Sequence, residues 1–250
     1  MDVAGDGGKF QQYLDVQSRF TRYSAVNALL VLAQMPEAKR LGDYDHWKDR
    51  GGQVKRSPVS VSILEPHEYA KEDGTVGIGY NIKKVFDISQ VDTRKMKAIS
   101  PQSYDNRQLL KALVNKAPVK ITGVDDLPHD RYALTRLATG EILVRKGMEF
   151  ADTFRSVAQE LAFAELTAGP DTRKDATFSA HCASYILCKK YGVDTKGFSF
   201  EGSPSVFNGM DAKEVKGELS QIRDVAETIS SRMAKQLGAA QKAARAQEAR

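Results

Sequence analysis

The sequence has few of the residues on which several protein classes depend. Its 250 residues include two cysteines and one tryptophan. Cys182 and Cys188 stand six apart in a stretch with helical character, so their side chains point to different faces of the helix. They make no disulfide framework, and a reducing cytoplasm is the expected location of the protein.

Long apolar runs are also missing. The longest, residues 28–33, is much shorter than the ~18–20 residues that a membrane span requires. Residues 1–6 lack the basic start and the apolar stretch of a signal peptide. No membrane is therefore expected among the partners.

The common signatures of cofactor and nucleophile chemistry are absent too. Gly77-Ile78-Gly79 lacks the third glycine and the following helix of a dinucleotide-binding turn, and no Gly-x-x-x-x-Gly-Lys loop occurs. The four histidines are scattered and form no triad by spacing. They are His46, His67, His129 and His181. The sequence predicts no cofactor.

The net charge of +5 and the pI of about 9.0 first suggest a nucleic-acid partner. Residues 232–250 carry five Lys or Arg against one Glu, however, and the rest of the chain is almost balanced. Bulk charge alone therefore does not indicate DNA binding. The composition, 41% hydrophobic and 28% charged, is typical of a globular protein.

Periodicity predicts an α+β protein in which helices alternate with short strands. The expected helices cover residues 10–35, 43–50, 104–115, 150–167, 176–191 and 211–237, the first of which Ser18 or Ser24 could break. The expected strands cover residues 59–64, 77–88, 119–121, 131–137 and 141–145. Residues 1–9 are expected to be flexible, 10–100 and 101–237 to form two domains divided at Pro101–Ser103, and 238–250 to form a basic tail.

Several motifs in the first half resemble the ArdC-type antirestriction proteins of plasmids and conjugative elements. They are Tyr-Ser-x-x-Asn at residues 23–27, a turn with Trp47, the basic turn Lys55-Arg56, the strand 62–66, and residues 85–90. In that family this order forms an N-terminal domain associated with single-stranded DNA. The resemblance covers about residues 10–236.

A second motif, residues 154–165, resembles the His-Glu-x-x-His helix of the zincin-like metallopeptidase domain that follows in ArdC proteins. In an intact motif, two histidines at i and i+4 bind one zinc ion and the intervening Glu activates its water. Here Gln159 and Phe163 occupy the two histidine positions, and Glu160 keeps the position of the base. Neither an amide nor a phenyl ring replaces imidazole as a zinc ligand.

The resemblance implies a third ligand, usually a carboxylate, near residues 178–185, where His181 and Cys182 are the only donors. Glu160, His181 and Cys182 could together hold a metal. We instead expect a degenerate site with no metal and no catalytic residue, in which Phe163 fills the space of the lost imidazole and metal. Glu160 is expected to form a structural hydrogen bond or salt bridge, for instance to the 176–191 helix.

Single-strand binding requires cations for the phosphates and aromatic faces for the bases. The candidate side chains for this role come from the first helix, the turn that follows it, and the segment around the tryptophan. They are Arg22, Tyr23, Asn27, Lys39, Arg40, Trp47, Lys48, Lys55 and Arg56. Tyr23 and Trp47 could instead be core anchors, and the basic residues are the stronger candidates.

Three functions therefore remain open. The first is a noncatalytic ArdC-like protein of a mobile element that binds single-stranded DNA, in antirestriction or as an accessory to conjugation. The second is a metal-dependent peptidase with a rearranged site built on Glu160 and His181. The third is a module that captures a peptide or protein in the inactive cleft.

Overall fold

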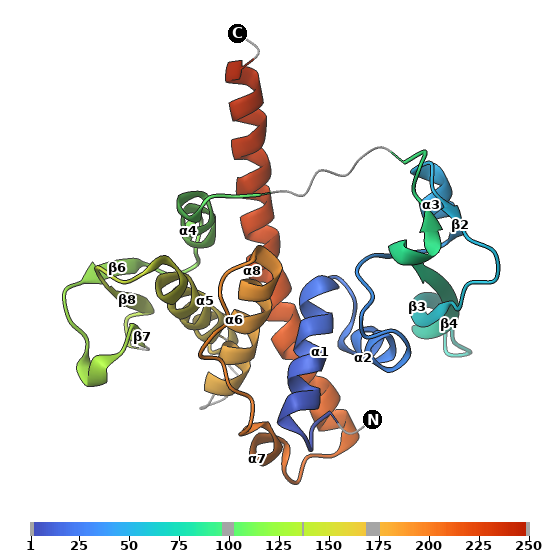
Figure 1. The fold of residues 1–250 in the computed structure, drawn as a ribbon. Coiled ribbons are helices and arrows are strands. Elements are labelled where there is room, and N and C mark those ends of the chain that lie inside the picture. Colours follow the sequence, from blue (N-terminus) through green and yellow to red (C-terminus); the bar gives the residue numbers. More distant parts are fainter. Residues whose placement is uncertain (1–2, 97–102, 137, 169–175, 249–250) are drawn as a thin grey trace. The chain divides into compact units, whose positions relative to one another are not determined.

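The computed structural model describes residues 3–96, 103–136, 138–168 and 176–248, with side chains up to residue 239. The chain divides into two compact units, one of residues 23–101 and one of residues 2–22 and 102–250 (Figure 1). Both combine helices with small sheets, which confirms the α+β class. In the described part of the chain, no helix has the length and apolar character needed to cross a membrane.

In its described residues, 23–96, the first unit contains two helices, five strands and a 3-10 turn. The helices are α2 (Ala25–Gln34) and α3 (Tyr44–Asp49), with the turn η1 (Ile88–Gln90). The strands are β1 (Leu41–Gly42), β2 (Gln53–Val54), β3 (Val61–Ala70), β4 (Val76–Asp87) and β5 (Val91–Asp92). All pairings among them are antiparallel.

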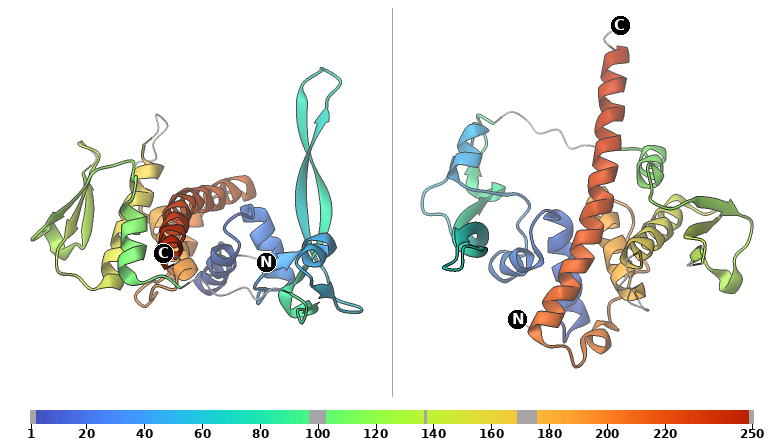
Figure 2. Two further views of the ribbon diagram at one scale, coloured as in Figure 1. Left: turned by 90° about the horizontal axis from the view of Figure 1, so that it is seen from above. Right: turned by 180° about the vertical axis from the view of Figure 1, so that it is seen from behind.

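A long hairpin dominates this unit. β3 and β4 pair in register from Val61 opposite Val85 to Ala70 opposite Val76, and Figure 2 shows them as a twisted ribbon that extends away from α3. β4 matches the predicted strand 77–88 within one residue at each end. β3 continues to Ala70, beyond the predicted end at residue 64, because its outer half is exposed and polar residues interrupt its apolar alternation. Gly77 and Gly79 lie inside β4, so they form no phosphate-binding loop.

The core of the first unit gathers where α3 meets the base of the hairpin. Trp47, Phe86 and Val91 form a buried cluster that Val54 and Ile88 cover. The predicted helix at 43–50 begins one residue later, because the Asp43 carboxylate accepts from the His46 N–H at 2.8 Å and so caps α3.

Six helices, three strands and a short turn make up the described part of the second unit. The helices are α1 (Gly7–Arg19), α4 (Asn106–Val114), α5 (Phe150–Leu166), α6 (Thr177–Tyr191), α7 (Ser203–Phe207) and α8 (Ala212–Glu248). The strands are β6 (Ile121–Val124), β7 (Ala133–Arg136) and β8 (Glu141–Arg145), with η2 at Pro128–Asp130.

The sheet of this unit has the order β6-β8-β7, in which β8 runs parallel to β6 and antiparallel to β7. It is therefore a mixed sheet, and β7 is one of its edges. α5 packs against β7 and β8, and α6 packs against α1, α5 and α8. Apart from the half-buried His181, the residues of α6 from Ser179 to Cys188 are consequently buried.

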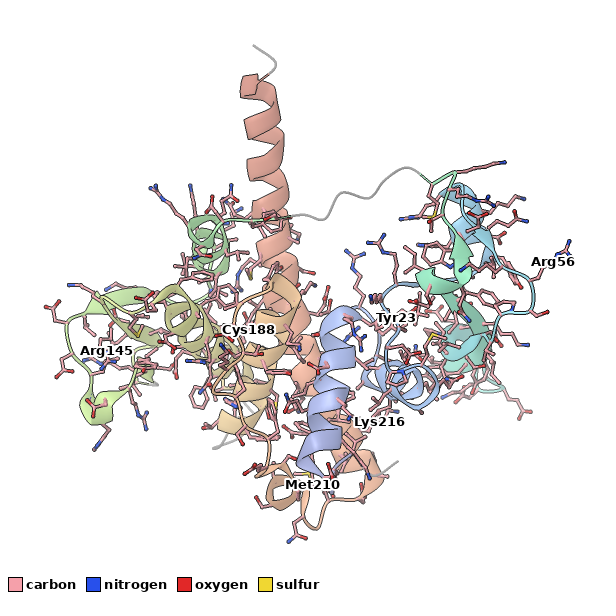
Figure 3. All side chains as sticks on the ribbon, viewed as in Figure 1. Tyr23, Arg56, Arg145, Cys188, Met210 and Lys216 are labelled. Carbon is pink, nitrogen blue, oxygen red and sulfur yellow. The ribbon has the colours of Figure 1, made fainter. Side chains whose placement is uncertain are left out.

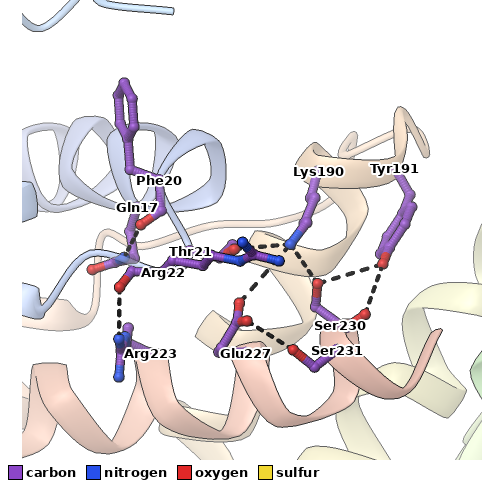
Figure 4. Close-up of polar contacts among 10 residues, drawn as sticks. All are labelled: Gln17, Phe20, Thr21, Arg22, Lys190, Tyr191, Arg223, Glu227, Ser230 and Ser231. Atoms are coloured by element: carbon purple, nitrogen blue, oxygen red, sulfur yellow. Dashed lines mark hydrogen bonds and ion pairs between the residues drawn. The ribbon is translucent and has the colours of Figure 1, made fainter. Parts of the chain in front are cut away.

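α1 belongs to the second unit, which corrects the predicted start of the first domain at residue 10. The periodic stretch 10–35 is two helices, since helical structure stops at Arg19 and Ser24 caps α2. Figure 4 shows how the end of α1 is held: Lys190 donates to the Thr21 hydroxyl at 2.8 Å, and Arg223 donates to the Arg22 carbonyl at 2.9 Å. The first unit therefore begins at Tyr23.

Other boundaries moved less. The division between the units falls between Pro101 and Gln102, at the predicted stretch, although both residues lie outside the described part of the chain, as does Leu137 at the end of a predicted strand. The predicted 211–237 helix continues as α8 to Glu248, so the basic tail is largely a helical extension.

Candidate functional site

The α5 segment that resembles a His-Glu-x-x-His helix lies at a cleft of about 660 Å³ in the second unit, between α5, α6 and the edge strand β7. Gln159, Glu160 and Phe163 line it from α5, and His181 lines it from α6. The fold therefore brings together the four positions that the sequence pattern singled out. Each of the four side chains makes a different kind of contact.

The carboxylate of Glu160 is hydrogen-bonded to the sheet. Its Oε2 accepts from the backbone N–H of Thr135 at 2.8 Å and from the Thr135 hydroxyl at 2.6 Å. Because Thr135 lies on β7, Glu160 contacts the sheet. The expected contact with the 176–191 helix was therefore wrong. A carboxylate that satisfies an edge-strand N–H stabilises the packing of α5 on the sheet.

Gln159 and His181 face each other, with Gln159 Oε1 3.2 Å from His181 Nδ1. Burial lowers the pKa of His181, the nearby Arg155 lowers it further, and a hydrogen bond to the backbone of Ser199 opposes both. The ring is therefore neutral at neutral pH. The amide of Gln159 consequently occupies the polar edge that His181 presents to the cleft.

The described residues do not fit a metal site. Phe163 supplies no donor and is half-buried at the cleft wall, and Cys182 is fully buried, which raises the pKa of its thiol well above the usual range. No group of three or more His, Cys, Asp or Glu in the described ranges could hold a metal ion. The structure therefore does not assemble the alternative metal site of Glu160, His181 and Cys182. The carboxylate of Glu160 is hydrogen-bonded to Thr135, and Cys182 lies in the core.

Glu165 lies off this face, as its position two residues after Phe163 predicts. Its carboxylate pairs with Arg232 of α8 at 2.9 Å. Arg155 also lines the cleft, where it pairs with Asp152 and donates to the Lys196 carbonyl at 2.6 Å. These contacts join α5 to its neighbours and leave the cleft without a free described carboxylate.

Two of the predicted DNA contacts are parts of the fold. Trp47 is 0% exposed, and its indole N–H donates to the Phe86 carbonyl at 3.0 Å. The amide of Asn27 donates to the Leu64 carbonyl at 2.9 Å and accepts from the Leu64 N–H at 2.8 Å. In this structure neither side chain is presented to a base, so both are removed from the candidate interface.

Gln34 repeats the contact of Asn27 one step along the same strand. Its amide accepts from the Ser62 N–H and donates to the Ser62 carbonyl, both at 2.9 Å. The two amides thus occupy the open edge of β3, which would otherwise be free to pair with another strand. Their separation of seven residues, two turns of α2, is the sequence signal that could have revealed this pair.

Tyr23 and Arg22 stand on either side of the division between the units. Tyr23, in the first unit, is half-buried, and burial raises the pKa of its hydroxyl. Arg22, in the second, has an exposed side chain, while its carbonyl accepts from Arg223. They are therefore not grouped here as one site.

The remaining five candidates are exposed cations of the first unit, which we call the basic turn cluster. They are Lys39, Arg40, Lys48, Lys55 and Arg56. None forms an ion pair with another described residue. Figure 3 shows the Arg56 side chain extending outward from the segment between β2 and β3.

Three members of the basic turn cluster meet at the turn after β4. The backbone N–H groups of Lys39 and Arg40 donate to Asp87 Oδ1 at 2.7 and 2.8 Å, and Lys55 Nζ donates to the Ser89 carbonyl at 2.8 Å. Burial by itself would raise the pKa of Asp87, but the backbone donors of Arg40, Ser89 and Lys39 outweigh it and lower the pKa. The buried Asp87 thus anchors two cationic residues by their backbone and leaves their side chains in solvent.

Tyr44 is an aromatic residue that the sequence pattern did not single out. Its ring is 59% exposed on α3 and lies 4.6 Å, centroid to centroid, from the ring of Phe86. Lys48 follows it by four residues, so the two side chains share one face of α3. An exposed ring beside a cation supplies the stacking surface that Trp47 does not.

No protein-family model matches the chain. A Bacillus anthracis protein, the uncharacterized pXO2-81, is 23% identical over 280 aligned residues that cover 90% of this chain, but the chain spans only about half, 48%, of that relative. The antirestriction protein ArdC from plasmid R388 is similar in structure. Its metal-free form superposes with a TM-score of 0.53 at 15% identity, covering 85% of this chain and 86% of ArdC.

The Mn(II)-bound form of the R388 protein is similar to the same degree, with a TM-score of 0.55, 13% identity and 85% coverage of each chain. The likeness extends over about 85% of the chain in both comparisons. Identity this low establishes the fold and leaves activity open. The chain therefore has the ArdC fold, as its sequence motifs had indicated.

Proposed function

We propose that this chain is a noncatalytic ArdC-like protein that binds single-stranded DNA through the basic turn cluster of its first unit. The observation that carries the proposal is the cluster itself, five exposed cations without ion-pair partners among the described residues. When such cations neutralise the phosphates of DNA, the DNA releases its condensed counterions, which favours binding without sequence preference. Tyr44 adds a ring on which a base can stack.

The likeness to an antirestriction protein of a plasmid supports a role in protecting incoming DNA, or an accessory role in conjugation, on a mobile element. The second unit contributes no chemistry in this proposal. Water near Glu160 would need a metal to become a nucleophile at neutral pH, and the described residues provide no ligand set for one. The chain spans only 48% of the relative from Bacillus anthracis. We therefore propose a function for this chain alone and not for a protein of the relative's length.

The test is fluorescence anisotropy of a labelled oligothymidylate titrated with the full chain at low salt. We expect binding that the double change Lys55→Ala with Arg56→Ala weakens several-fold and to the same degree for oligonucleotides of different sequence. Lys213→Ala with Lys216→Ala removes two exposed cations of α8 and is the matched control, expected to bind like the parent. Equal binding by the parent and the Lys55/Arg56 variant would remove the cluster from the interface.

Tyr44→Ala provides an independent check on base stacking. Loss of the ring should weaken binding by about 1–3 kcal/mol for a stacked base, with little loss of folding stability because Tyr44 is mostly exposed. An abasic oligonucleotide shows whether lost base stacking causes the weakening, since the parent and the Tyr44→Ala variant should bind an abasic strand equally. A Tyr44→Ala variant that binds like the parent contradicts the stacking role alone.

A second candidate function is capture of a peptide in the cleft of the second unit. It is favoured by the volume of that cleft and by Phe163, which stays half-exposed at its wall. Addition of unlabelled peptides to the DNA complex, with the Phe163→Ala variant as a comparison, separates it from DNA binding. A peptide that binds the parent but not the Phe163→Ala variant, and leaves bound DNA in place, would support it.

A further inference from the structure

A second hollow of the second unit lies apart from the degenerate site. α4, β6, β8 and the start of α5 surround a groove of about 930 Å³. Its apolar lining comes from all four elements. The residues are Leu110, Val114, Ile121, Val144, Phe150 and Val157. α5 contributes to both hollows, but no residue lines both this groove and the first cleft.

The floor of this groove, which we call the α4 groove, is only partly covered by the fold. Val144 and Val157 are buried, whereas Leu110, Ile121 and Phe150 are half-buried and Val114 is 40% exposed. Apolar side chains from a helix, a strand and a second helix therefore border one open hollow. Contiguous apolar surface of this kind marks interaction sites more often than isolated exposed residues do.

The charged side chains at the groove that are free to contact a ligand are positive. Arg107 and Lys111 stand one turn apart on α4, are exposed, and form no ion pair with another described residue. Asp105 is the one acid of the lining, and its carboxylate is used by the cap of α4, where it accepts from the Gln108 N–H at 2.7 Å. Residues 106–120 contain four basic residues and no acid.

We propose that the α4 groove binds an acidic amphipathic helix of a partner protein. Leu or Phe side chains spaced i, i+3, i+4 and i+7 on that helix would fill the apolar floor, as in other helix-in-groove complexes. Its carboxylates would meet Arg107 and Lys111 at the rim, where charge complementarity selects the partner. DNA phosphates would use the same two cations but leave the apolar floor uncovered, so we favour a protein ligand.

The test uses the full chain and a fluorescein-labelled model helix with leucines at the four anchor positions and glutamates elsewhere. We expect saturable binding by anisotropy, and at least about tenfold weaker binding to Arg107→Glu with Lys111→Glu, since two attractive contacts become repulsive. Val114→Glu places a charge on the exposed part of the floor and should also weaken binding. Lys213→Glu with Lys216→Glu, which changes the net charge equally, should bind like the parent.

Two further probes decide between specific docking and general charge attraction. A helix with lysines in place of the glutamates should not bind, and neither should a glutamate-rich peptide without leucines. Binding of the leucine-free peptide as tightly as the full probe would overturn the proposal, as would equal affinity of the parent and the Arg107/Lys111 variant. Displacement of the probe by oligothymidylate, with loss of DNA binding in the same variant, would assign the groove to nucleic acid instead.

Discussion

The carboxylate of Glu160 accepts two hydrogen bonds from one residue, Thr135, and so links the α5 helix to the edge strand of the second sheet. The residue at the position that the resemblance assigns to a general base therefore makes a structural contact. Thr135→Val removes the hydroxyl donor at nearly constant volume. We expect a loss of about 1–2 kcal/mol of unfolding free energy, measured by urea denaturation.

The control for this change is Thr153→Val. The Thr153 hydroxyl donates only to the Glu149 carbonyl of its own helix, at 3.0 Å, so its loss should have a much smaller effect. If the two variants lose the same stability, the contact of Glu160 with β7 is not what holds α5 on the sheet.

The single tryptophan gives a direct probe of the first unit. Because Trp47 is wholly buried, its fluorescence should be blue-shifted and poorly quenched by acrylamide. Saturation with oligothymidylate should leave it nearly unchanged, because no base reaches the indole. Strong quenching by the oligonucleotide would restore Trp47 as a stacking residue.

Restoring the two imidazoles should restore only part of a metal site. The double change Gln159→His with Phe163→His places two histidines one helical turn apart, the spacing that zinc ligands use. We expect weak zinc binding, because the third, carboxylate ligand that the resemblance implies is absent and His181 is the further donor at this cleft. Metal analysis after dialysis checks this, with each single variant as control. Near-stoichiometric zinc in the parent chain would contradict the degenerate site.

Protonation of His181 should destabilise the folded chain. Burial lowers the pKa of this ring, so at mildly acidic pH the unfolded chain binds a proton that the folded chain does not. Its contribution is therefore complete above the unfolded pKa of about 6.5 and is lost as the pH falls below it. His46, whose pKa burial also lowers, acts in the same direction.

The measurement is the urea midpoint at about pH 7.5 and pH 5.5, on either side of the unfolded histidine pKa. His181→Gln should lose less stability than the parent on acidification, while His129→Asn, a change at an exposed histidine, should follow the parent. A parent and a His181→Gln variant with the same pH dependence would show that this ring does not titrate on unfolding.

Sequence patterns predicted the limits of two helices of the second unit closely. α5 and α6 start and end within one residue of the predicted limits, because apolar spacing and Gly192, which follows α6 with a φ of 71°, mark them. The family motifs also placed Gln159, Glu160, Phe163 and His181 around one cleft. Such patterns can be predicted because they depend only on residues that are close together in the sequence.

Long-range partners could not be predicted in the same way. Nothing local shows that Trp47 donates to Phe86, that Asn27 pairs with Leu64, or that Glu160 faces Thr135, since each contact joins segments at least 25 residues apart. The same reason explains α1, whose periodicity continues into α2 although its packing partner is α6. Tyr44 was missed because the exposure of one aromatic residue depends on how its helix packs.

DNA binding without metal is the property on which the proposed function depends. It is measured most directly by the affinity for a labelled oligothymidylate across a series of salt concentrations, in EDTA and again with added Mn(II) or zinc. We expect binding at low salt, a linear fall of log affinity with log salt concentration, and the same curve with and without metal. No binding at low salt, or binding that appears only when a metal is added, would contradict a noncatalytic single-strand-binding protein.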